Sequence, residues 1–305
     1  MNKIKYLIIV FSLIKTINVQ SCINEYRTLL SGEVVYIDAE DLLPQAKFSD
    51  KTSLLKELGE LEKLYNKTKK IEDYSDLGSM YVYLGNYNKA KLIFKEIEKK
   101  SPGRYQTAAN LGTTYELLEQ NDSALYWIKR AVKINPNSHD GSEWIHIKIL
   151  ETKIKAKGDN NKLWNQNILS LNFGSTEIPQ SPPNVDLNQL EKHLYIQLCE
   201  RMTFIKPKNP IVAQLLFDLG NVRALTSDVK SGLLVFQIAQ EYGYSSEILN
   251  KRLLYFETLQ QESDINNQFD EWSVYIWIFV VILCSFLIYR VVVALRNNNI
   301  ANKSL

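Results

Sequence analysis

Two of the chain's three histidines lie beside a glutamate, and this group comes closest to a reactive site. The segment HDGSEWIH holds His139, Glu143 and His146, and the three-residue spacing places Glu143 and His146 on one face of a helix. Imidazole and carboxylate groups bind zinc, but the HExxH spacing of metalloproteases is absent. We therefore expect these residues to cap the start of a helix rather than to bind a metal. Asp140 would be the N-cap, with Glu143 three residues later as in a capping box.

Motifs of nucleotide binding and nucleophilic catalysis are absent from the sequence. It contains no GxxxxGK[ST] or GxGxxG loop and no GxSxG motif. Carboxylates are scattered among lysines, as in LEKLYNKTKK, which is typical of solvated helix faces. Lys and Arg number 36 against 34 for Asp and Glu, so no broad basic surface for nucleic acid is expected. The sequence predicts no catalytic residue, no cofactor and no metal ion, and hence a protein that is not an enzyme.

The three cysteines form neither a CxxC pair nor a zinc-like spacing. Cys284 falls within an apolar run and is interpreted as a space-filling residue. Two alternatives remain for Cys22, namely a disulfide with Cys199 and the attachment of a lipid. The tetrapeptide VQSC loosely resembles a lipobox, although Gln20 fits that motif poorly.

Residues 1–21 have the layout of a secretory signal peptide. Two lysines precede an apolar run of nine residues, Tyr6 to Ile14, which is too short to span a bilayer. Val19 and Ser21 then suit the −3 and −1 positions of a cleavage site before Cys22. The alternatives are an uncleaved anchor and a buried strand.

Residues 272–295 are predicted to form a transmembrane helix. The stretch WSVYIWIFVVILCSFLIY holds 18 residues without a charge. As a helix it is ~27 Å long, close to the thickness of the hydrocarbon core. Trp272 and Tyr289 at its ends suit the two interfaces. Acidic residues precede the span and basic residues follow it, so the tail 296–305 is predicted to be cytoplasmic and residues 22–271 to lie outside.

Between these ends, the chain repeats itself after 34 residues. LGSMYVYLGNYNKAKLIFKEIEKKSP begins at Leu77, and LGTTYELLEQNDSALYWIKRAVKINP begins at Leu111. Small residues recur where helices must approach closely, large apolar residues fill the space between them, and proline stops the second helix. The recurring positions are Leu77, Gly78, Tyr81, Ala90, Phe94 and Pro102 in the first copy and Leu111, Gly112, Tyr115, Ala124, Ile128 and Pro136 in the second.

This pattern resembles the tetratricopeptide repeat, a helix–turn–helix unit of the same length. The resemblance implies an all-α fold, an α-solenoid of helix hairpins that we expect in two lobes. It places repeats at about 71–104 and 105–138, within a first lobe at 51–166 that includes capping helices. Leu54, Leu58, Leu61 and Tyr65 share a helix face upstream, and GDNN at 158–161 leaves the third unit incomplete.

The remaining segments are assigned from weaker patterns. Residues 22–50 are predicted to form an extended arm, in which Val34, Val35 and Ile37 form a short strand or pack as part of the arm. The proline-containing segment 167–186 is predicted to be a linker or surface loop. A second lobe at 187–262 would contain a degenerate hairpin around Gly220, Gly232 and Phe236.

Candidate partner-binding residues come from the 34-residue frame, in which first helices begin near Ile71, Tyr105 and His139. The resemblance implies that such helices line a concave binding face. Asn110 is the leading candidate because its amide can both donate hydrogen bonds to a peptide backbone and accept them from it. The alternative is that Asn110 makes a local hydrogen bond within its helix or loop. This face lacks the Lys and Arg cluster with which some relatives clamp a carboxylate. The side chains expected to face a partner are Ser79, Tyr83, Asn110, Thr113, Leu117 and Glu143.

The expected function is that of a membrane-anchored scaffold that binds a protein or peptide partner, with self-association as a further option. The alternatives are a structural subunit of an envelope complex and a transducer that acts through a membrane partner. Richness in Lys, Asn and Ile suggests an AT-rich bacterial genome, and the compartment outside the membrane would then be the periplasm. In a eukaryotic secretory pathway, the sequons at Asn66 and Asn121 would instead be accessible.

Overall fold

The computed structural model describes residues 27–28, 34–35, 44, 50–164, 166–261, 277–283, 286 and 290. The predicted signal peptide, the tail, and most of the predicted arm and transmembrane helix lie outside these residues. Strands β1 (Arg27–Thr28) and β2 (Val34–Val35) pair in antiparallel fashion. Within the described residues, no helix is both long enough and apolar enough to cross a membrane.

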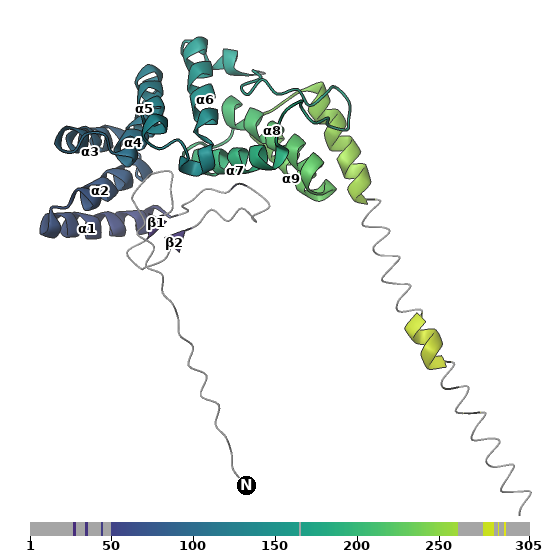
Figure 1. Cartoon of the computed structure of the whole chain (residues 1–305). Helices are drawn as coiled ribbons and strands as arrows, with labels where there is room; N and C mark the ends of the chain where they lie inside the picture. The colour runs from purple at the N-terminus through teal and green to yellow at the C-terminus, as the bar shows by residue number, and fades with distance from the viewer. Residues whose placement is uncertain are drawn as a thin grey trace, which may run out of the picture.

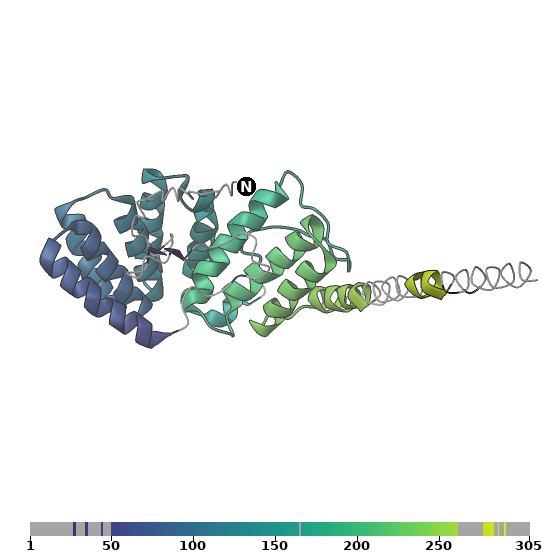
Figure 2. The same ribbon diagram turned by 90° about the horizontal axis from the view of Figure 1, so that it is seen from below.

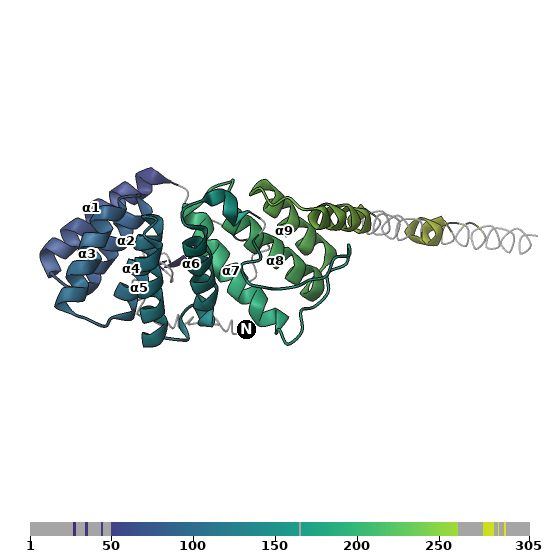
Figure 3. The ribbon, with the colours of Figure 1, turned by 90° about the horizontal axis from the view of Figure 1, so that it is seen from above.

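Helices follow one another in chain order along the molecule, as Figures 1 and 3 show. Figure 2 shows the same succession from the opposite side. Residues 247–261 form a further helix at the end of the stack. The labelled helices are α1 (Lys51–Thr68), α2 (Ile71–Tyr83), α3 (Tyr87–Lys100), α4 (Tyr105–Leu117), α5 (Asn121–Ile134), α6 (Glu143–Ala156), α7 (Leu187–Phe204), α8 (Pro210–Thr226) and α9 (Val229–Glu241).

Three glycines allow the two helices of a pair to pack closely. A Cβ added at Gly78 of α2 would lie 2.6 Å from Phe94 Cε1 of α3, and one at Gly112 of α4 would lie 2.4 Å from Ile128 Cδ1 of α5. The same contact recurs in the second half of the chain, where a Cβ at Gly220 of α8 would lie 2.5 Å from Phe236 Cδ1 of α9. Each glycine precedes its partner by 16 residues (94 − 78, 128 − 112 and 236 − 220). This shared contact confirms that α8 and α9 form a hairpin like those of α2–α3 and α4–α5.

The turns inside the first two hairpins also repeat each other. Gly85 N donates to Val82 O and Asn86 N donates to Tyr81 O, at 2.9 and 2.8 Å. After a shift of 34 residues (119 − 85), Glu119 N donates to Glu116 O and the next amide donates to Tyr115 O, both at 2.9 Å. Gly85 has φ +78° and Glu119 has φ +58°, so the second turn places a residue with a Cβ in the left-handed region.

The third unit departs from the expected start. The first helices of the first two units begin at Ile71 and Tyr105 as predicted, but α6 begins at Glu143 rather than near His139. A 3₁₀ turn, η1 (Ser138–Gly141), precedes α6, and both of its central residues have positive φ. The residue at the N-cap of α6 is Ser142, whose side chain makes no capping hydrogen bond to the helix, so the predicted Asp140 cap is wrong.

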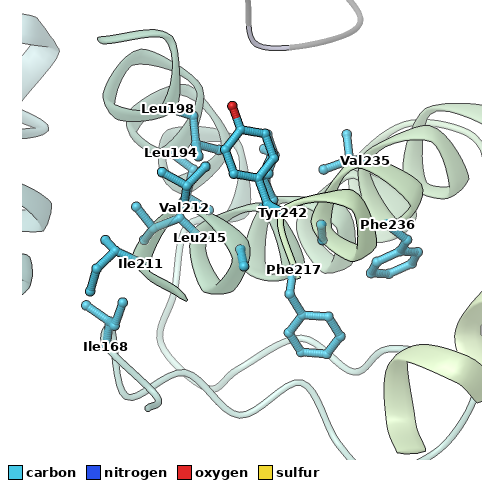
Figure 4. Packing of buried hydrophobic residues seen from close by; sticks show 14 of the residues in the cluster. Ile168, Leu194, Leu198, Ile211, Val212, Leu215, Phe217, Val235, Phe236 and Tyr242 are labelled. Atoms are coloured by element: carbon cyan, nitrogen blue, oxygen red, sulfur yellow. The ribbon is translucent and has the colours of Figure 1, made fainter. Parts of the chain in front are cut away.

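No second helix follows α6 in the third unit, as the GDNN signal predicted. A short 3₁₀ turn, η2 (Asn160–Leu163), and irregular chain lead instead to α7. The predicted linker within this segment packs into the molecule, because Ile168, Leu169 and Phe173 are buried in the core of the second half. Figure 4 shows Ile168 beside Ile211 and the other aliphatic side chains of this core.

Arg252 ties the irregular segment to the last helices. Its side chain is fully buried, with 0% exposure, and it donates to the carbonyl oxygens of Phe173 and Gly174 at 2.8 and 3.1 Å. It also donates to Thr176 O at 3.2 Å and to the side-chain oxygen of Asn221 on α8. A guanidinium has enough donors in one plane to bind all four oxygens. The segment is therefore part of the core rather than a surface loop between lobes.

Helix α6 belongs to both halves of the molecule. Leu150 packs with Ala124 and Ile128 of α5. Ile145 and Ile149 belong to the core formed with α7, α8 and α9. The two halves therefore share one helix instead of meeting across a flexible linker.

Candidate functional site

The last residue of α7, Phe204, lies between the ends of α2 and α4. Its ring stacks on Tyr83, the last residue of α2, with 5.5 Å between ring centroids. A cavity of about 310 Å³ lies on the Tyr83 side, and a cavity of about 60 Å³ lies on the side of Leu117, the last residue of α4. We call these two cavities and their shared wall, Phe204, the inner groove.

The larger cavity has one aromatic and apolar wall, and Asp50, Lys51 and Thr203 line the rest of it. Tyr83 and Tyr87 line it from the α2–α3 hairpin, and Leu54 lines it from the first turn of α1. Asp50 holds that first turn in place, because its carboxylate accepts hydrogen bonds from the amides of Thr52 and Ser53 at 3.0 Å each. Such a wall suits an apolar or aromatic side chain of a ligand.

The smaller cavity is lined by charged side chains that converge on Glu116 of α4. His146 Nε2 of α6 lies 2.7 Å from Glu116 Oε2. Lys153 Nζ of α6 and Arg201 Nη1 of α7 donate to Glu116 Oε1 at 3.0 and 2.9 Å. A buried carboxylate is stable only with such partners, and two helices, α6 and α7, contribute them here.

These contacts set the protonation of both buried groups. Burial alone would raise the pKa of Glu116, but Arg201, Lys153 and His146 together hold it well below its usual range. Burial alone would lower the pKa of His146, but the negative charge of Glu116 and the hydrogen bonds to Glu116 and Glu143 raise it above the usual value. The pair thus favours the carboxylate form of Glu116 and the protonated form of His146.

A second carboxylate extends this cluster toward the start of α6. Glu143 Oε1 lies 2.6 Å from His139 Nδ1, and its other oxygen lies 3.3 Å from His146 Nδ1. Burial would raise the pKa of Glu143, but His139 and His146 lower it. The predicted proximity of these three residues is confirmed. Among the residues that the structure describes, no group of His, Cys, Asp and Glu is arranged to hold a metal ion.

The predicted partner-binding residues are less accessible than expected. Asn110 is 0% exposed, and its side-chain amide donates to Ser79 Oγ of α2 at 3.4 Å, a bond between two helices rather than the local bond expected as the alternative. Ser79, Thr113 and Glu143 are also buried. Ser79 and Asn110 lie against each other between α2 and α4, and Glu143 lies against His139 and His146. The expectation that they are exposed is wrong.

Three predicted positions do line the inner groove. Tyr83 is half-buried against Phe204, and Leu117 is half-buried at the smaller cavity, which Thr113 also lines. The stated lack of a Lys and Arg cluster is wrong, since Lys153 and Arg201 meet at this face. Both of these side chains already bind Glu116, a residue of the chain itself.

Sequence reasoning missed Glu116, Lys153, Arg201 and Phe204. Lys153 follows His146 by seven residues, which is two helical turns, so their shared face was visible in the sequence. Arg201 and Phe204 had no such signal. Their position depends on how the irregular segment after α6 returns α7 to the stack, and that segment has no periodicity.

The comparisons with known proteins agree with the repeat geometry. A family model described as tetratricopeptide repeat matches residues 105–138, which span α4, α5 and the start of η1. A search of curated proteins found no match to the chain. The match begins at the first residue of α4, and the α2–α3 hairpin repeats its contacts 34 residues earlier. The chain thus contains a tetratricopeptide repeat within a stack of helix pairs.

Proposed function

We propose that this chain is a scaffold that binds a peptide segment of a partner protein in the inner groove. The observation that carries the proposal is the stacked pair of Tyr83 and Phe204, which forms one wall of a cavity of about 310 Å³. Aromatic residues at the centre of an interface often supply much of the binding energy. The tetratricopeptide repeat supports this role, because such repeats serve protein–protein interaction.

The smaller cavity would contribute specificity rather than a strong charge contact. Glu116 already satisfies Lys153 and Arg201, so an acidic ligand group would have to displace it from both. We therefore expect a ligand with an apolar or aromatic anchor for the larger cavity and neutral polar groups beside Glu116. This preference distinguishes the inner groove from a carboxylate-binding site.

The experiment uses the full chain in mild detergent, tagged at the C-terminus. Partners are recovered by co-purification, and overlapping peptides from the recovered protein are then tested for binding by fluorescence anisotropy. Tyr83→Ala should weaken peptide binding about tenfold or more, because it removes half of the stacked wall.

Tyr126→Ala is the matched control, since Tyr126 is an exposed tyrosine on α5 with a side chain 58% accessible. It should leave binding unchanged. Equal binding by the parent chain and the Tyr83→Ala variant, with unchanged thermal melting, would exclude the inner groove as the site.

We further propose that the scaffold is anchored in a membrane, with residues 22–271 on the non-cytoplasmic side and a periplasmic location. The support is the charge asymmetry around the apolar stretch in the sequence. In addition, residues 277–283 are helical and all seven side chains are apolar and exposed. Protease added to the outer face of spheroplasts should degrade the helical domain and spare only the tail. A protected domain would refute this orientation.

A further inference from the structure

A third cavity lies on the side of α6 that faces away from the inner groove. It has a volume of about 420 Å³ and is bounded by α6, η2 and the chain up to Ser170. Lys148 and Lys155 line it from α6. At 100° per residue they lie on roughly the opposite helix face from His146 and Lys153, which line the smaller inner cavity. We call this cavity the outer groove.

The outer groove lies where the chain leaves α6. After α6 the chain forms only η2 and irregular structure, whereas α3 packs on α2 and α5 packs on α4 in the first two units. Trp164, Asn167 and Ile168 from this irregular segment line the groove together with α6.

The groove is lined by more positive than negative charge. Lys148, Lys155 and Lys162 are exposed side chains along it. Its one lining carboxylate, Glu151, already binds Lys129 of α5 at 3.2 Å. Within the part of the chain that the structure describes, Lys148 and Lys155 bind no carboxylate, and Lys162 lies 3.5 Å from Asp159. At least two ammonium groups are thus available to a ligand.

The other groups of the groove fix its shape rather than add reactivity. The hydroxyl of Thr152 donates to Lys148 O at 2.8 Å. The Asn167 side-chain amide donates to Leu171 O, and its oxygen accepts from Leu171 N. Trp164 is half-buried and packs so closely on Gly243 that a Cβ there would lie 2.9 Å from the indole ring. The groove is a pre-formed cationic surface with a fixed aromatic wall.

We propose that the outer groove binds an acidic peptide segment of a partner protein. Lys148 and Lys155 are seven residues apart on one helix, so their Cα atoms are ~10 Å apart. In a polyproline II segment, which has three residues per turn and a rise of ~3.1 Å per residue, carboxylates three residues apart share one face and lie ~9 Å apart. A volume of about 420 Å³ accommodates a short segment of this kind. Nucleic acid is disfavoured because the net charge of the chain is only +2, so no broad basic surface is expected.

The test measures binding of a fluorescein-labelled peptide with Asp and Glu three residues apart to the full chain in mild detergent. The double variant Lys148→Gln, Lys155→Gln should bind about tenfold more weakly, and added salt should weaken binding to the parent chain. The matched control is Lys95→Gln, Lys99→Gln, which removes the same charge from exposed positions on α3 and should bind like the parent. The single variant Lys162→Gln gives a second measurement if the double variant melts earlier than the parent.

Three outcomes would overturn the proposal. They are equal peptide binding by the two double variants, equally tight binding of an Asn and Gln version of the peptide, and tighter binding of oligothymidine or of anionic lipid vesicles than of the peptide. The Tyr83→Ala variant should bind the acidic peptide normally, because Tyr83 lies in the inner groove. Failure of this proposal is therefore distinguishable from failure of the proposed function.

Discussion

Glu116 and Asp218 are both buried carboxyl groups, yet their surroundings favour opposite charge states. Glu116 binds Lys153, Arg201 and His146, which keep it ionised. Asp218 of α8 has a hydrogen bond from the Gln214 amide at 3.1 Å. Burial raises its pKa to about 8, so it is mostly protonated at neutral pH.

Asp218→Asn should therefore stabilise the protein more as the pH rises. The pKa of Asp218 is raised in the folded state from the ordinary value of 3.8, so the folded state holds this proton more tightly than the unfolded state. Its contribution to stability is fully present below about pH 4 and is lost as the pH rises toward about 8. Asparagine does not titrate and keeps the bond to Gln214. The measurement is urea unfolding near pH 5 and near pH 8, and a pH-independent difference between variant and parent would contradict this account.

At the scale of elements, the hairpins were predictable because each position has a local reason. Glycine faces a large side chain, and helices stop before Pro102 and Pro136, so period and boundaries follow from residue types. The start of α6 was predicted four residues early, because the left-handed conformations of His139 and Asp140 have no signal in the repeat frame. The inner groove was only half predictable, because Tyr83 and Leu117 belong to the repeat while Phe204 does not.

Gly112→Leu should unfold the α4–α5 hairpin and the helices packed on it. Even a Cβ at this position would lie 2.4 Å from Ile128 Cδ1 and 3.3 Å from its backbone nitrogen, so a larger side chain forces the helices apart. The control is Gly59→Leu on α1, where an added Cβ meets nothing within 4 Å. Thermal melting followed by circular dichroism compares the two, and similar melting temperatures would show that close packing at Gly112 is unimportant.

Glu119→Gly should stabilise the turn between α4 and α5 by about 1 kcal/mol, since a residue with a Cβ is disfavoured in the left-handed region. The equivalent position in the first hairpin is already Gly85, with the same hydrogen bonds. Denaturant unfolding measures the gain. Gly85→Glu should lose a comparable amount, and a loss of stability in Glu119→Gly would indicate that the Glu119 side chain has a role of its own.

At the scale of the whole molecule, α6 makes the two predicted lobes one folded unit. Ile149 and Leu150 are adjacent in sequence, but Ile149 belongs to the core of the second half and Leu150 packs on α5. The predicted division at 167–186 therefore does not separate two bodies. The sequence could not reveal this, because a helix with apolar residues on two faces looks the same whether it joins two cores or lies within one.

Residues 50–261 should accordingly unfold in one cooperative transition. Ile149→Ala and Leu150→Ala should each destabilise the protein by about 2–5 kcal/mol, and both halves should respond to either change. Hydrogen exchange followed by mass spectrometry measures α3 and α9 in the same sample. If Leu150→Ala accelerated exchange in α3 and left α9 protected as in the parent, the halves would be independent.

The 16-residue spacing between each packing glycine and its partner has a genetic consequence. Gly78, Gly112 and Gly220 each have one large side chain opposite them, on Phe94, Ile128 and Phe236. A loss-of-function change of Gly112 to a small branched residue should therefore have an intragenic suppressor at position 128, where a smaller residue vacates the required volume. Changes at 94 or 236 should not rescue it. Selection for revertants would thus recover pairs of substitutions 16 codons apart, and the repeat would be traceable in how its mutations compensate one another.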